Sequence, residues 1–186
     1  MHGVTERELA HLVDQLGRCA SGRAFSAGLN PAQWAALRYL ARANRFSRTV
    51  SGFAAYHGTT RGTASQTIKS LVRKGYLIRR PLARDQRSFR LELTTRARRL
   101  LETDPIDELV QAAGSLPRSH REALGEGLAL LLERVHAARD CPAYGVCRSC
   151  RHLATGKGSC EFYCSLNDEM LAPDELACIC VDHIGR

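Results

Sequence analysis

The chain has 186 residues, of which 44% are apolar, and a formal net charge of +8. A chain of this size and composition can bury one compact core with a few appended segments. No apolar run reaches the roughly 18 residues that a membrane span needs, and the first residues lack the apolar stretch of a signal peptide. We therefore expect a cytoplasmic protein with no membrane partner.

Basic residues and cysteines are both unevenly distributed. Residues 61–99 carry twelve Lys or Arg against only Asp85 and Glu92, so the rest of the chain is slightly acidic. Seven of the eight cysteines lie between Cys141 and Cys180. In a reducing compartment, clustered thiols more often bind metal or take part in redox chemistry than form disulfides. The sequence thus divides into a body and a cysteine-rich tail that begins near residue 141.

The first two predicted helices each begin with a capping signal. Thr5 and Glu8 form a capping box, and the helix that follows carries an apolar face of Leu9, Leu12, Val13, Leu16 and Ala20, which Cys19 extends as a core thiol. Asn30 and Pro31 begin the second helix. Its inner face is predicted to hold Trp34, Leu37, Leu40 and Ala41.

Two short helices are predicted next, and a glycine turn at Gly58 separates them. Thr49 or Ser51 caps the first, and Thr59 or Thr60 caps the second, which ends at Lys74 and Gly75. The second helix should turn Ala64, Ile68, Leu71 and Val72 inward. A helix that follows a tight turn in this way can enter the major groove of DNA.

The outer face of that helix is polar and basic. Thr63, Ser65 and Gln66 suit the reading of base edges, while Lys69 and Arg73 suit the neutralisation of phosphates, and Arg61 lies at the N-terminal tip. Arg79 and Arg80 should add phosphate contacts. Residues 76–79 and 89–93 are β-rich and predict a hairpin with a long charged tip at 80–87. Arg84 and Arg87 at this tip can reach a minor groove.

The last predicted helices are suited to association. A helix that begins at Thr94 or Thr95 should be interrupted at Asp104 and Pro105. The final helix carries an apolar stripe that fits a partner helix, formed by Leu124, Leu128, Leu131, Leu132 and Val135.

Several of these segments together resemble the MarR family of transcription regulators. They are Leu29 to Leu40, Lys74-Gly-Tyr-Leu-Ile-Arg79, Asp85-Gln-Arg87 and Leu93-Thr-Thr-Arg-Ala-Arg98. The resemblance implies a mainly α fold with a small β-hairpin wing, in which Arg87 enters the minor groove and Asp85 orients basic neighbours. It also implies a homodimer that binds a pseudo-palindromic operator in double-stranded DNA. Because no hydrolase or phosphate-loop motif is found in the sequence, we expect no enzymatic activity.

The resulting domain division has four parts. It comprises an N-terminal dimerisation helix at 1–28, a winged helix-turn-helix at 29–95, dimerisation helices at 96–140 and a loop-rich cysteine tail at 141–186.

The tail carries the spacing of a metal site. Cys147 and Cys150, two residues apart, can hold one metal from a single turn, and Cys164 and Cys180 can close the site from later loops. Metal would supply the folding energy that a polar, turn-rich tail lacks.

The same four cysteines are selected by a resemblance to a C-terminal extension of some MarR-like chains. The resemblance rests on Gly145-Val-Cys147-Arg-Ser-Cys150, Tyr163-Cys-Ser-Leu166 and Cys180-Val-Asp-His183. Cys141, Cys160, Cys178 and His183 are alternates.

Spacing alone leaves the metal open. Structural zinc sites usually use two close cysteine pairs, of which this tail has one, whereas iron–sulfur clusters tolerate distant ligands. We expect an iron–sulfur cluster, 2Fe–2S rather than 4Fe–4S, with zinc as the alternative. The cluster would sense redox state or iron, and its loss would loosen the tail against the last helix. Two other interpretations stay open: a scaffold with a zinc tail, and a dithiol redox protein, although a thioredoxin-like setting is missing around Cys147 and Cys150.

Overall fold

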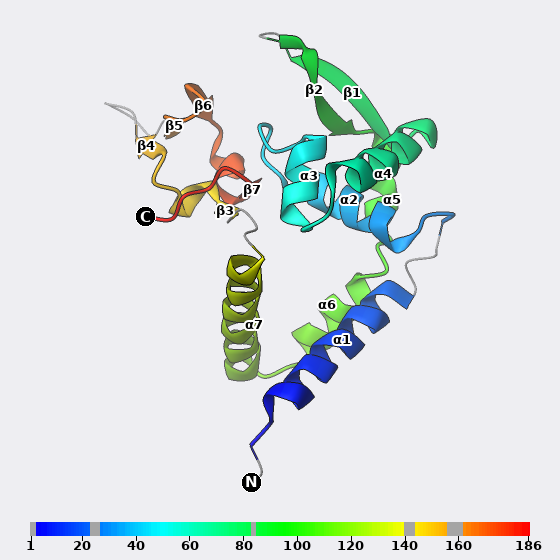
Figure 1. Cartoon of the computed structure of the whole chain (residues 1–186), viewed down its shortest axis with the longest axis vertical. Helices are drawn as coiled ribbons and strands as arrows, with labels where there is room; N and C mark the ends of the chain where they lie inside the picture. Colours follow the sequence, from blue (N-terminus) through cyan, green and yellow to red (C-terminus); the bar gives the residue numbers. More distant parts are fainter. Residues whose placement is uncertain (1–2, 23–26, 83–84, 140–143, 156–161) are drawn as a thin grey trace.

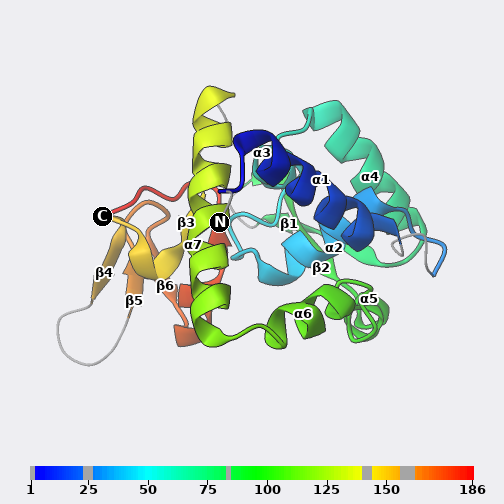
Figure 2. The same ribbon diagram turned by 90° about the horizontal axis from the view of Figure 1, so that it is seen from below.

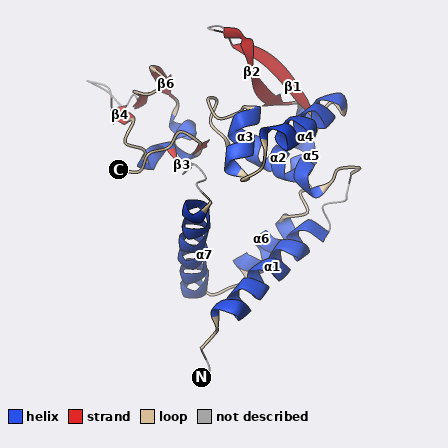
Figure 3. Cartoon of the chain, in the orientation of Figure 1, coloured by secondary structure: helices blue, strands red, loops and turns tan. Residues whose placement is uncertain are grey.

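The computed structural model describes residues 3–22, 27–82, 85–139, 144–155 and 162–186. Within these ranges the chain is mainly helical, with a hairpin and small sheets (Figures 1 and 3). The elements of the body are α1 (Glu6–Gly22), α2 (Pro31–Arg42), α3 (Val50–Tyr56), α4 (Arg61–Arg73), β1 (Leu77–Leu82), β2 (Asp85–Leu93), α5 (Thr95–Leu101), α6 (Asp107–Gly114) and α7 (Arg118–Ala138). Those of the tail are β3 (Gly145–Val146), η1 (Cys147–Ser149), β4 (Leu153–Thr155), β5 (Phe162–Cys164), β6 (Glu169–Leu171), η2 (Pro173–Ala177) and β7 (Ile179–Cys180).

Side-chain caps define where the central helices begin. Asn30 and Gln33 form a full capping box at α2, with Pro31 in the first turn. Thr49, Thr60 and Thr94 each accept a hydrogen bond from the backbone N–H three residues later, at the starts of α3, α4 and α5. Each cap satisfies a donor that the helix itself cannot. The predicted starts of these helices are confirmed.

The core lies between α2, α4 and the base of the hairpin. Trp34, Leu37, Ile68 and Leu77 are at most 1% exposed, and they form one cluster with Leu91 of β2. One predicted core position is wrong, because Ala41 is exposed. Tyr39 and Gln33 are buried on α2 instead, and each has polar partners in the fold. Burial of a polar side chain is tolerated when it is hydrogen-bonded in this way.

The hairpin is longer than the sequence predicts. β1 pairs with β2 in antiparallel register from Leu77 opposite Leu93 to Pro81 opposite Phe89, and the register shifts after Pro81. The predicted charged tip at 80–87 is therefore wrong, since most of it belongs to the two strands. This part of the hairpin projects away from the core (Figure 1), so neither of its faces needs a row of apolar residues. The sequence there lacks the alternation of polar and apolar residues by which a strand is recognised.

Helices α1, α6 and α7 leave apolar side chains uncovered in a single chain. Leu12 of α1 is 51% exposed and Leu132 of α7 is 50% exposed, and neither α6 nor α7 has a buried residue. Cys19 is also exposed, so its predicted burial as a core thiol is not found within one chain. Figure 1 shows α1, α6 and α7 at the end of the molecule opposite the hairpin, and in Figure 2, which is seen from that end, they lie in front of it. None of the described helices has the length and apolar character needed to cross a membrane.

The tail folds into two small sheets and packs on the body. β3 pairs with β7, and β4, β5 and β6 form a three-stranded antiparallel sheet. Leu171 and two cysteines form a small core, which Phe46 of the body completes. Ile179 is 4% exposed and belongs to the main core, so the tail and the central helices share a packed interface.

Candidate functional site

The first candidate site is the outer face of α4. Arg61, Thr63, Gln66, Lys69 and Arg73 are exposed, and Ser65 is half-buried, so the helix presents the predicted polar and basic face. Within the part of the chain that the structure describes, no hydrogen bond or ion pair is found for the side chains of Arg61, Lys69 or Arg73. These three cations therefore remain available to an anionic partner.

The N-terminus of α4 adds to the attraction of this face for anions. Thr60 caps α4 through Thr63, and the first turn contains no acidic residue. Backbone N–H groups at a helix N-terminus attract anions, and phosphate is a common one. Gly58, which has a φ of 57°, makes the turn between α3 and α4 in the left-handed region that suits glycine.

Other cations of the basic segment are engaged inside the fold. The Nζ of Lys74 donates to the Gly28 carbonyl at 2.6 Å and to Gln33 Oε1 at 3.0 Å. The guanidinium of Arg79 stacks on Phe89, and Arg80 pairs with Glu92 at 3.0 Å. Arg79 and Arg80 would therefore have to give up these contacts in order to bind phosphate as predicted. Sequence alone could not separate structural from available cations.

The predicted tip residues lie only partly within the described structure. Asp85 and Arg87 belong to the backbone of β2, and their side chains are not described. Arg84 lies outside the described residues. The β1–β2 hairpin, which corresponds to the predicted wing, has its base beside α4 (Figure 1).

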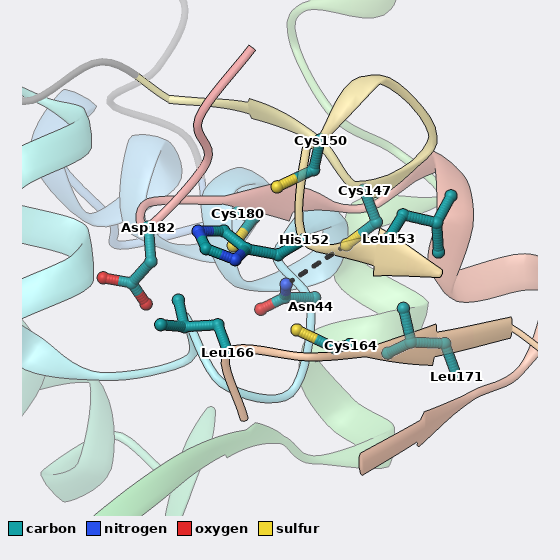
Figure 4. Close-up of a pocket in the computed structure, with 10 residues that line it drawn as sticks. All are labelled: Asn44, Cys147, Cys150, His152, Leu153, Cys164, Leu166, Leu171, Cys180 and Asp182. Atoms are coloured by element: carbon teal, nitrogen blue, oxygen red, sulfur yellow. Dashed lines mark hydrogen bonds between the residues drawn. The ribbon is translucent and has the colours of Figure 1, made fainter. Parts of the chain in front are cut away.

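The second candidate site is a pocket where the tail meets the body. Cys147, Cys150, Cys164 and Cys180 line it together with His152 and Asp182, which spacing did not select, and with Asn44 of the body (Figure 4). The four cysteines come from η1, its following residue, β5 and β7. The fold thus brings to one pocket four thiols that are spread over more than thirty residues of sequence.

The alternates lie elsewhere or outside the description. Cys178 donates to the Asp174 carbonyl, and His183 hydrogen-bonds Ser149 at 3.0 Å, so neither lines the pocket. The ring of His183 packs over Gly145, where a Cβ would lie 2.6 Å from Nδ1. Cys141 and Cys160 lie outside the described residues.

Amide donors point at two of the four sulfurs. Asn44 Nδ2 donates to Cys147 Sγ at 3.4 Å, and Asn167 Nδ2 donates to Cys164 Sγ at 3.5 Å. The hydrogen bond from Cys147 lowers the pKa of Cys180 to about 6, with further hydrogen bonds from the Asp182 backbone, Asn44 and Ser47, against burial that raises it. The same bond to Cys180 raises the pKa of Cys147, and burial adds to that rise. The pocket therefore favours ionisation of Cys180 over ionisation of Cys147.

The donor set fits a soft metal, although the side chains do not form a coordination sphere as they stand. Among the described residues, no group of three or more His, Cys, Asp or Glu side chains is arranged to hold a metal ion. The pocket encloses a cavity of about 10 Å³, about the smallest space that can hold one water molecule. A single ion therefore needs smaller side-chain movements than a cluster of two irons and two sulfides.

Comparison of the sequence with known proteins gives one family match. Residues 27–88 match the sequence profile of the MarR family. No curated protein matches the sequence.

Solved structures share the fold at low sequence identity. A MarR transcriptional regulator from Methanosarcina mazei Go1 gives a TM-score of 0.59 at 20% identity, over 72% of this chain and 99% of that chain. The MepR–DNA complex of S. aureus gives 0.59 at 22% identity, over 70% and 96%. The transcriptional regulator BldR from Sulfolobus solfataricus gives 0.56 at 20% identity, over 72% and 99%.

The family profile covers residues 27–88, and the solved structures cover 70–72% of the chain. At such identities the structural likeness is one of fold. Residues 27–88 are thus similar in sequence to the MarR family, and the solved structures share the winged-helix fold of this chain.

Proposed function

We propose that this chain is a dimeric transcription regulator that binds double-stranded DNA in a sequence-specific manner. The observation that carries the proposal is the exposed face of α4, where three cations without partners in the described structure flank Thr63 and Gln66. S. aureus MepR, which shares the fold, has been solved as a complex with DNA. The exposed apolar side chains of α1 and α7 support association of two chains.

Each residue of the face has an expected task. Gln66 and Thr63 lie where base edges are read, while Lys69 and Arg73 lie further along α4, where they can neutralise phosphates. In a two-fold dimer the paired helices would address half-sites about 10 base pairs apart. The proposal assigns no catalytic role to any residue.

Selection from random duplexes tests this assignment. The full chain should enrich a pseudo-palindromic consensus, and Gln66→Ala should change the preferred bases at one position of each half-site. An Arg134→Ala variant, altered on the exposed surface of α7, is the control and should return the wild-type consensus. Failure to enrich any sequence would contradict specific binding, and an unchanged consensus for Gln66→Ala would contradict its role.

The cysteine pocket is proposed as the input of the regulator. Cys147, Cys150, Cys164 and Cys180 would hold a 2Fe–2S cluster, whose change of charge or occupancy would report redox state or iron supply. The support is the donor set, with its four sulfurs and two amide donors around one buried pocket. Amide N–H groups aimed at ligand sulfurs tune and orient such centres.

A zinc site is the second candidate, and the small volume of the cavity favours it. Zinc would hold the tail on the body as a structural centre and would make the chain a regulator or scaffold with another input. Anoxic purification followed by visible spectroscopy and analysis of iron, sulfide and zinc separates the two. Brown protein with equal iron and sulfide supports the cluster, whereas colourless protein with one zinc per chain refutes it.

A further inference from the structure

The tail contacts the body through a short loop, residues 43–48, which we call the docking loop. It lies between α2 and α3. Ala43 forms a parallel bridge with Ile179, and the Asn44 N–H donates to the Ile179 carbonyl at 2.8 Å. In return, the Val181 N–H donates to Ser47 Oγ at 3.1 Å. The expectation that the tail rests on the last helix is therefore incomplete, because this docking is to the helix-turn-helix itself.

Charged contacts fix the outer edge of the same interface. Arg45 pairs with Glu175 at 3.1 Å and with Glu169 at 3.4 Å, and it also donates to the Met170 carbonyl. The Arg45 guanidinium lies over the ring of Phe46, which is part of the tail's small core. The ion pairs of Arg45 attach the loop to the tail without involving a cysteine.

Asn44 connects the loop to the sulfurs. Its side chain is buried, with the residue 1% exposed. One end, Nδ2, donates to Cys147 Sγ, and the other end, Oδ1, accepts the backbone N–H of Ser47 at 2.8 Å. Both functional groups of one buried amide are thus shared between the pocket and the loop (Figure 4).

The opposite side of the docking loop holds two parts of the DNA-binding unit. Tyr39 donates its hydroxyl to the Ser47 carbonyl at 2.7 Å, and the Thr49 N–H donates to the same carbonyl at 2.7 Å as α3 begins. The Leu91 N–H of β2 donates to the Arg48 carbonyl at 2.7 Å. Displacement of the loop would therefore move both the start of α3 and the base of the wing.

We infer that Asn44 is a positioning residue that couples the state of the cysteine pocket to α3 and the wing through the docking loop. This inference rests on the proposed metal input. A sulfur held in place by a metal is a good acceptor for an amide N–H. When the metal leaves, Cys147 Sγ is no longer fixed as the acceptor of the Asn44 amide, which favours rearrangement of this buried side chain and with it the release of Ser47.

A matched pair of variants isolates this connection. Asn44→Asp keeps an oxygen that can accept the Ser47 N–H and removes the donor to Cys147. Asn167→Asp removes the corresponding donor to Cys164 but lies wholly within the tail. Asn44→Leu, of similar volume and without charge, covers the case in which a buried carboxylate prevents folding.

The experiment measures amide hydrogen exchange of the full-length chain, metal-free and loaded with Cd²⁺, whose thiolate charge-transfer absorbance reports binding. In wild type, metal should slow exchange at least tenfold both in the tail and in peptides that cover residues 43–56. In Asn44→Asp or Asn44→Leu, metal should slow exchange in the tail alone. Asn167→Asp should retain both responses.

Each other outcome counts against a defined claim. If wild type is protected only in the tail, or if both Asn44 variants behave as wild type, the coupling is wrong while the metal site stands. If the charge-transfer band does not develop in wild type, the metal proposal fails and the coupling fails with it. If Asn167→Asp also loses protection of residues 43–56, the effect comes from weakened metal binding and not from Asn44.

Discussion

Gly52 of α3 is the position where the packing of the docking loop can be perturbed most directly. A Cβ at Gly52 would lie 2.6 Å from Tyr39 Oη and closer still to the Ser47 carbonyl oxygen, which is backbone and cannot turn away. Gly52→Ala therefore forces the loop and α3 apart. Overpacking of this kind costs about 1–3 kcal/mol of unfolding free energy, against a helix-propensity gain of about 0.5–1 kcal/mol for alanine over glycine.

Gly62 of α4 provides the control, because a Cβ there meets only Thr60 Oγ1, at 3.8 Å. Both substitutions gain the same propensity, so the difference between them isolates the steric cost. Urea unfolding of the metal-free chain should give a midpoint about 0.5–1 M lower for Gly52→Ala than for Gly62→Ala, with an m-value of about 2–3 kcal/mol/M. Equal midpoints, or a more stable Gly52→Ala, would refute the close approach of the loop to α3.

Two further predictions concern charge. Lys69→Ala should weaken operator binding and reduce the log–log salt slope by about 0.9 for each subunit's lost phosphate contact, measured by fluorescence anisotropy; an unchanged slope would remove Lys69 from the interface. The hydrogen bond from Cys147 lowers the pKa of the Cys180 thiol to about 6 in the fold. Ionisation of Cys180 therefore stabilises the metal-free fold fully above the pKa that this thiol has in the unfolded chain, and the stabilisation is lost as the pH falls toward 6. Wild type should gain at most about 1.4 kcal/mol per pH unit over this window, Cys180→Ser should not, and parallel pH profiles of unfolding would contradict the shift.

Local signals made much of the fold predictable. Asn30, Thr49, Thr60 and Thr94 cap their helices through bonds that span three residues, so the sequence around each cap contains the whole interaction. The structure confirms these caps. The close spacing of Cys147 and Cys150 is also a local signal, and both residues line the cysteine pocket. Their assignment as metal ligands stays a prediction.

Features that depend on distant contacts were not predictable. Asn44 and Ser47 meet Ile179 and Val181 across more than 130 residues, and neither carries a sequence pattern that marks a docking site. The exposure of Ala41 and Cys19 depends on what packs beside each helix, which periodicity does not report. His152 lines the cysteine pocket only because β4 pairs with β5.

The central claim is that the cysteine pocket controls DNA binding by α4 and the wing. Its most direct test is the affinity of the full-length chain for its selected operator, measured by anoxic fluorescence anisotropy with the native metal bound and after chelation. A coupling free energy of about 1–3 kcal/mol predicts a change in affinity of about 5- to 150-fold between the two states. Equal affinities in both states would show that the tail is structural and would contradict the claim.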